Sequence, residues 1–195
     1  EEASRCSDGS AATIAQAMAK GSLMGARGNS GVILSQIFRG LARGLDGKNS
    51  FTGKDLAQAL VESSNLAYKG MNKPVEGTIL TVIREAAAAA KMKCSREDTD
   101  VLSIMETIVE EAKASVARTP TLLPVLQQAG VVDAGGQGLY IILEGALCYL
   151  KGETDIEFEI QEPSHPVAAA LTSSSSENYG YCTEFIIEGQ DLSLD

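Results

Sequence analysis

Three segments of the chain place glycines directly before stretches with helical periodicity. The first runs from Gly21 to Gly31 and reads GSLMGARGNSG, the second covers residues 70–78, and the third covers residues 118–136. Small residues let the backbone approach a ligand closely. The first N–H groups of a helix have no partner within the helix and carry partial positive charge, which suits a phosphate group. The three segments are therefore candidate phosphate contacts.

Each segment also has a purely structural interpretation. Asn29 or Ser30 could cap a helix, Thr78 could cap the next, and the remaining glycines could serve turns and close packing. The residues alone leave both interpretations open. The chain has neither the GxxxxGKS/T pattern of a P-loop nor a strand-linked GxGxxG pattern, which excludes those two kinds of nucleotide site.

Apolar residues recur at helical spacing along most of the chain, so we expect an all-α fold, an up-and-down antiparallel helical bundle or barrel. Thr52, with Asp55 three residues later, is the predicted cap of the third helix. The predicted helices cover residues 13–20, 34–45, 52–68, 78–92, 98–117 and 136–150.

The order of the predicted helices groups the three glycine-containing segments. Successive connections of an up-and-down bundle alternate between its two ends. The three segments are the first, third and fifth connections, provided that residues 122–128 stay at that end of the bundle and do not form a full antiparallel helix. They therefore share one end, whereas the connections at 46–52 and 93–98 share the other and hold no comparable glycine cluster.

Two motifs carry a family resemblance. Gly21 to Gly31 with the following VILSQ, and residues 130–138 with the sequence GVVDAGGQG, resemble the nucleotide-binding domain of the fatty-acid kinase catalytic subunit. That domain is related to the ATP-binding subunit of dihydroxyacetone kinase. The resemblance implies a nucleotide-binding helical domain over residues 9–152, followed by a linker and the start of a middle domain over residues 153–195.

The resemblance implies that ATP and Mg²⁺ bind at one end of a helical barrel. It also implies a DegV-like carrier protein that presents a fatty acid, an acyl phosphate product used in phospholipid synthesis, and a cytoplasmic location. No residue is assigned a catalytic role. The implied nucleotide contacts are a phosphate loop, a second loop with its helix start, and a lid-like segment: Gly28, Asn29, Ser30 and Gly31; Gly77 and Thr78; Thr119, Pro120 and Asp133.

The front of the chain departs from this family pattern. The family has a first helix and an Asp-rich Mg²⁺ loop, whereas residues 8–10 offer a single carboxylate, Asp8. We therefore expect the metal loop upstream of Glu1. On its own this chain is expected to lack kinase activity and to bind nucleotide weakly if at all. The apolar surface that the family's first helix would cover is expected to be exposed in this chain. Such a surface favours association between chains, including formation of a homodimer.

Composition excludes several other functions. A net charge of −10 argues against nucleic-acid binding, and no apolar run approaches the ~20 residues of a membrane span. Four well-separated cysteines favour free thiols in a reducing cytoplasm, although Cys182 could join a metal site that a middle domain completes. Alternation at 155–160 and 179–187 predicts two short strands in a β-prone tail.

Two other functions remain open from the sequence. One is a dihydroxyacetone-kinase-like phosphotransferase domain that acts on a small polyol. The other is a non-catalytic helical interaction module, in which the glycines are only structural.

Overall fold

The computed structural model describes residues 2–6, 8–96 and 100–153, and within these ranges it contains helices and no strand. This confirms the predicted all-α fold. The predicted strands at 155–160 and 179–187, Cys182 and most of the predicted middle-domain segment lie outside the described residues. The elements are η1 (Ala3–Arg5), α1 (Ala11–Gly25), α2 (Gly28–Gly44), α3 (Gly53–Lys69), α4 (Ile79–Arg96), α5 (Val101–Leu122), α6 (Pro124–Ala129) and α7 (Ala134–Lys151).

Side-chain caps explain where four of these helices begin. Thr52 and Asp55 form a reciprocal capping box at α3, which confirms the predicted cap. Ser10, Asp100 and Asp133 each accept a backbone N–H in the first turn of α1, α5 and α7. Helix α2 differs because Arg27, its N-cap residue, makes no side-chain capping hydrogen bond.

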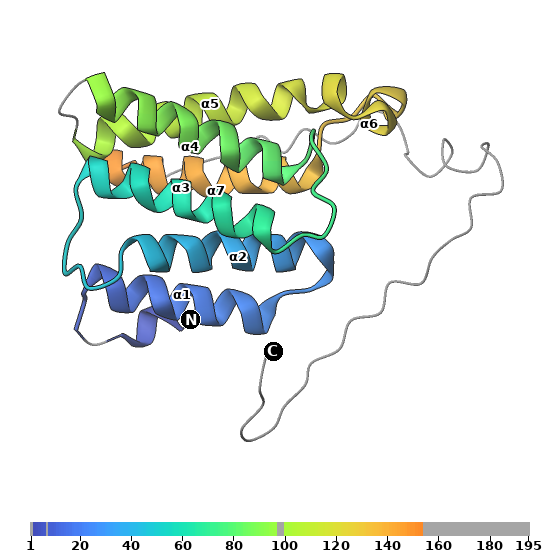
Figure 1. Cartoon of the computed structure of the whole chain (residues 1–195). Coiled ribbons are helices and arrows are strands. Elements are labelled where there is room, and N and C mark those ends of the chain that lie inside the picture. The colour runs from blue at the N-terminus through green and yellow to red at the C-terminus, as the bar shows by residue number, and fades with distance from the viewer. Residues whose placement is uncertain (1, 7, 97–99, 154–195) are drawn as a thin grey trace. The chain divides into compact units, whose positions relative to one another are not determined.

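The helices follow one another up and down, as predicted. Each of α1 to α5 packs against the next in the chain, and α7 packs against α4 and α5. Figure 1 shows the α1–α2 connection, the α3–α4 connection and α6 at one end of the helices, and the α2–α3 connection at the other. The predicted grouping of the three glycine-containing segments is therefore confirmed.

The core lies mainly between α3, α4, α5 and α7. Helices α4 and α5 supply its centre, where Ile83 and Ile108 have no exposed surface. Alanines on the same faces allow these two helices to lie close together. Removal of this apolar surface from water is the main force that holds the bundle. The fully buried apolar residues are Ala59, Val82, Ile83, Ala86, Ala90, Ile104, Ile108 and Ala112.

Two glycines bring α2 unusually close to α3. A Cβ atom at Gly40 would lie 2.2 Å from the Cα atom of Ser63, and one at Gly44 would lie 2.4 Å from the Cα atom of Ala59. No side chain fits at such distances, so the backbones themselves are in contact. The pair of glycines on one face of α2 thus fixes how closely the second half of α2 lies against α3.

The first glycine-rich segment is shorter than predicted. Helix α1 continues through Gly21 and ends at Gly25, so only Ala26 and Arg27 connect it to α2. Glycine lowers helix propensity, but packing of α1 against α2 outweighs that cost. At Gly21 a Cβ atom would lie 3.1 Å from Cγ of Glu2, so the glycine also makes room for the preceding segment.

Helix α5 also extends beyond its predicted end at residue 117, to Leu122, and includes Pro120. Proline has no N–H to donate to the carbonyl four residues earlier, which is that of Val116. The hydroxyl of Thr119 donates to this carbonyl instead, at 2.7 Å. The side chain of one residue therefore compensates for the proline that follows it.

Helices α1 and α7 carry exposed apolar side chains. More than a third of the residue surface is exposed at five of them: Leu23 and Met24 on α1, and Ile142, Tyr149 and Leu150 on α7.

Among the described residues, no helix is both long enough and apolar enough to cross a bilayer. The three described cysteines, Cys6, Cys94 and Cys148, form no disulfide bond with one another.

The contact between α2 and α3 gives a first prediction. Gly40→Ala should lower the free energy of unfolding by about 1–3 kcal/mol, because its methyl group overlaps the Ser63 backbone. Urea denaturation followed by circular dichroism measures the change.

The matched control for this prediction is Gly138→Ala in α7, where no atom lies within 4 Å of the new methyl group. Its stability should stay the same or rise by up to about 1 kcal/mol through helix propensity. Equal stability of the two variants would contradict backbone contact at Gly40.

Candidate functional site

The first turn of α2 presents backbone N–H groups to solvent. Gly28, Asn29 and Ser30 are exposed, and no side chain caps this helix start. Gly28 has a φ of +63°, a left-handed value that glycine adopts without strain. The four residues from Gly28 to Gly31 were predicted as a loop, but they form the first turn of the helix itself. Their N–H groups therefore point along the helix axis, as in helix-based anion sites.

Gly135 brings three helix starts together. A Cβ atom at this position would lie 3.6 Å from the Ser30 hydroxyl oxygen at the start of α2 and 3.4 Å from Cβ of Ile79 at the start of α4. Gly135 is itself the second residue of α7. The N-termini of α2, α4 and α7 thus converge at one end of the bundle, and their partial positive charges add there.

Asp133 fixes the start of α7. Its carboxylate oxygen Oδ2 accepts the N–H of Gly136 at 2.7 Å. Its own N–H donates to the hydroxyl oxygen of Thr119 at 3.0 Å, and the Thr119 side chain is fully buried. Thr119 and Pro120 were predicted in a lid-like segment, whereas they lie in the last turn of α5. The hydrogen bond between Thr119 and Asp133 joins the end of α5 to the start of α7.

Gly77 closes the α3–α4 connection against the end of α5. Its φ is +81°, and a Cβ atom there would lie 2.9 Å from Cβ of Leu123 and 3.1 Å from the carbonyl oxygen of Thr119. Its N–H donates to the hydroxyl of Thr81 at 2.8 Å. The adjacent Thr78 donates its own hydroxyl to the carbonyl of Val75 at 2.7 Å. Position 77 requires glycine for two reasons, the positive φ and the lack of space for a Cβ atom.

A cluster of charged and polar side chains lies beside this connection. The Glu76 carboxylate accepts hydrogen bonds from Thr81, Tyr68 and Arg84 at 2.6, 2.8 and 2.9 Å. The hydrogen bond from Thr81 is the main cause that holds the pKa of Glu76 below its usual range. Glu76 is therefore ionised at neutral pH and balances the charge of Arg84.

The described residues contain no preformed cluster of side-chain ligands for Mg²⁺. Within residues 2–6, 8–96 and 100–153 no group of three or more His, Cys, Asp or Glu side chains could hold a metal ion. The carboxylate of Asp133 already caps α7. Asp8 lies before α1, near residues 48 and 49 of the α2–α3 connection, and thus at the other end of the bundle.

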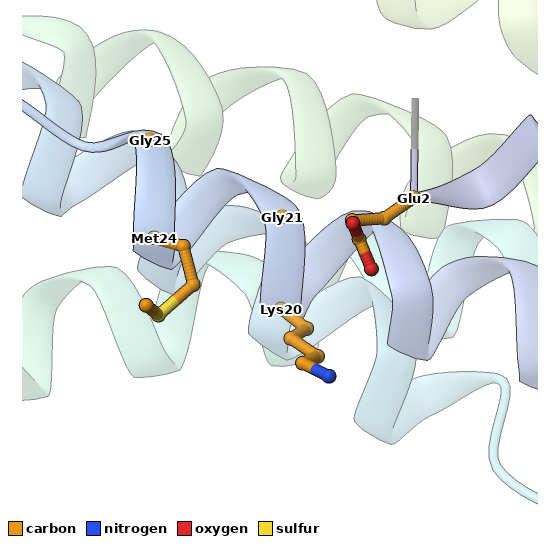
Figure 2. A pocket seen from close by; sticks show the side chains of 5 residues that line it. All are labelled: Glu2, Lys20, Gly21, Met24 and Gly25. Atoms are coloured by element: carbon orange, nitrogen blue, oxygen red, sulfur yellow. The ribbon is translucent and has the colours of Figure 1, made fainter.

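A shallow hollow lies elsewhere, over the outer face of α1. It is lined by Glu2 of the N-terminal segment and by α1 residues Lys20, Gly21, Met24 and Gly25. Figure 2 shows the Glu2, Lys20 and Met24 side chains around it. None of the predicted nucleotide contacts lines this hollow, so it is not part of the convergence at Gly135.

Sequence reasoning did not select Gly135, Gly136, Glu76 or Thr81. The two glycines stand in the quoted motif DAGGQG, but the sequence does not show that α2 and α4 begin opposite them. At Gly136 a Cβ atom would lie 2.9 Å from Cγ2 of Val82. Glu76 and Thr81 are five residues apart, and their spacing alone gives no signal of a shared hydrogen bond.

Residues 1–148 match the family model of the DAK2 domain. The chain belongs to the DAK2 domain family. This is a family of kinase-like phosphotransferase domains. The matched residues include helices α1 to α6 and all but the last three residues of α7. They therefore include all three helix starts that meet at Gly135.

Bacterial proteins resemble this DAK2 domain closely. Protein YloV of Bacillus subtilis is 43% identical over 182 residues, which cover 89% of this chain and 33% of YloV. An uncharacterized protein of Staphylococcus saprophyticus is 44% identical over 184 residues, covering 89% of this chain and 32% of the relative. The chain therefore spans about a third of the length of these relatives.

The support that Thr119 gives to α7 can be tested by removing its hydroxyl. Thr119→Val keeps the side-chain shape but leaves the Asp133 N–H and the Val116 carbonyl without this partner. The free energy of unfolding, measured in urea, should fall by about 1–3 kcal/mol.

Thr121→Val is the matched control, because Thr121 is exposed and its hydroxyl donates to the Arg118 carbonyl within the same helix. Its effect should stay within about 0.5 kcal/mol. A loss as large as that of Thr119→Val would contradict a special role for Thr119.

Proposed function

We propose that this DAK2 domain binds ATP where α2, α4 and α7 begin, as the nucleotide-binding part of a kinase. The proposed acceptor is the carboxylate of a fatty acid on a DegV-like carrier protein, and the product is an acyl phosphate. The observation that carries the proposal is the approach of Ser30 and Ile79 to Gly135, which unites three helix starts. Membership of a kinase-like family supports the phosphoryl-transfer chemistry.

The exposed first turn of α2 is the proposed phosphate contact. The backbone N–H groups of Gly28, Asn29 and Ser30 would donate to phosphate oxygens, together with the side-chain amide of Asn29 and the hydroxyl of Ser30. The starts of α4 and α7, near Thr78 and Gly135, would add positive potential on the other sides. These donors are parts of packed helices, so they need little reorganisation when charge develops during the reaction.

A fatty carboxylate makes the transfer chemically simple. Its pKa of about 4 to 5 leaves it an anion near pH 7, so no general base is needed. A carboxylate oxygen attacks the γ-phosphorus of ATP, and the bond from that phosphorus to the bridging oxygen breaks. The bond electrons leave with ADP. The task of this domain is therefore to hold the γ-phosphoryl group in line and to stabilise its charge.

The proposed phosphate contact is tested with the full-length protein, Mg-ATP and carrier-bound fatty acid. Acyl phosphate is trapped with hydroxylamine and measured as hydroxamate. Asn29→Ala and Ser30→Ala should each raise the KM for ATP by about 3- to 10-fold, as expected for loss of one hydrogen bond. Dihydroxyacetone should not replace the fatty acid.

Asn65→Ala and Ser95→Ala are matched controls, since both residues are exposed on helices and neither belongs to the first turn of α2, α4 or α7. They should leave the KM unchanged. An unchanged KM in the Asn29 and Ser30 variants would remove the proposed phosphate contact. Phosphorylation of dihydroxyacetone instead of the fatty acid would overturn the proposed acceptor.

A further inference from the structure

Glu76 joins two helices to the connection between them. Its carboxylate oxygen Oε1 accepts the hydroxyl of Tyr68 near the end of α3, at 2.8 Å. The other oxygen, Oε2, accepts from Thr81 and Arg84 in α4, at 2.6 and 2.9 Å. Arg84 in turn donates through Nε to the Tyr68 hydroxyl at 3.1 Å. Glu76, Tyr68 and Arg84 form a closed ring, and Thr81 is attached to it through Glu76. We call these four side chains the Glu76 clasp.

The clasp controls the backbone of Gly77. The same Thr81 hydroxyl that donates to Glu76 accepts the Gly77 N–H at 2.8 Å, and the Thr81 side chain is fully buried. A buried hydroxyl with both a donor and an acceptor partner has a fixed direction. Gly77 is consequently held at a φ of +81°, against the end of α5.

A continuous series of contacts leads from Gly77 to the start of α7. Gly77 packs on the carbonyl of Thr119, and the Thr119 hydroxyl accepts the N–H of Asp133. Asp133 then caps Gly136 in the first turn of α7. The adjacent Gly135 faces Ser30 of α2. Displacement of Gly77 therefore loosens the support of Thr119 and, through it, the helix start beside Ser30.

We propose that Glu76 is a positioning residue for the phosphate site, because its clasp holds the α3–α4 connection on α5 and so fixes the start of α7. The role in nucleotide binding rests on the proposed function. The mechanical coupling does not, because it concerns contacts within this chain alone. Glu76 and Thr81 act at a distance from the phosphate, through Gly77, Thr119 and Asp133.

Amide hydrogen exchange on this chain without nucleotide tests the coupling. Glu76→Gln and Thr81→Val should each speed exchange by roughly 3- to 10-fold at the amides of Gly77, Asp133 and Gly136. Exchange at the amides of α1, which packs mainly on α2 and contributes no residue to the clasp, should stay unchanged. Thr81→Ser restores the hydroxyl and should return exchange to that of the wild type.

Glu110→Gln in α5 is the matched control, because Glu110 is exposed and lies outside the clasp. It should leave all of these amides unchanged. Faster exchange at Gly77 alone would overturn the coupling to α7. A uniform increase over all helices would also overturn it, because that pattern signals global loss of stability.

ATP kinetics of the full-length protein test the link to the phosphate site. Thr81→Val should raise the KM for ATP by roughly 3- to 10-fold with little change in kcat, and Thr81→Ser should restore it. Coupled exchange without a change in KM would overturn the role in nucleotide binding but leave the coupling intact. Absence of ATP turnover in the wild-type protein would instead be a failure of the proposed function.

Discussion

The start of α7 can lie against α2 and α4 because Gly135 and Gly136 have no side chains. A Cβ atom at Gly136 would come within 2.9 Å of Val82, and one at Gly135 would meet Ile79 and approach Ser30. A side chain at Gly136 would push α7 away from α4, and a side chain longer than a methyl group at Gly135 would push α7 away from the starts of α2 and α4. This steric constraint creates the end of the bundle at which three positive helix termini meet.

The three converging helix starts explain how an acidic chain can offer a site for a polyanion. A chain with a net charge of −10 is an unexpected partner for a polyanion. Helix termini supply local positive potential from backbone dipoles, which does not depend on the number of basic side chains. Two carboxylates that precede these helix starts already have partners, because Asp133 caps α7 and Glu76 pairs with Arg84.

Much of this fold follows from the sequence. The 3.6-residue periodicity predicts the long helices, Thr52 and Asp55 predict one cap, and alternation of connections predicts which segments share an end. The predicted helix boundaries are wrong where tertiary contacts or side-chain hydrogen bonds extend a helix beyond its sequence pattern. Gly21 and Gly25 are poor helix formers, yet packing on α2 keeps them helical, and the Thr119 hydroxyl lets α5 continue through Pro120.

The candidate site was only partly predictable for the same reason. Gly28 to Gly31 and Asp133 belong to motifs that sequence reasoning can select, and Gly77 and Thr78 precede an evident helix. The Glu76 clasp depends on the approach of side chains from α3 and α4, which no local pattern encodes. Likewise, the sequence does not reveal that Gly135 faces Ser30 from a helix more than 100 residues away.

The central claim is that the starts of α2 and α7 form one phosphate site, and nuclear magnetic resonance of the ¹⁵N-labelled full-length protein tests it most directly. Addition of ATP at millimolar concentration should shift the amide signals of Gly28 to Gly31 together with those of Gly135 and Gly136. All of these signals should follow a single dissociation constant. The account is contradicted if these amides stay unchanged, or if the shifts gather instead at the hollow beside Lys20 and Gly21.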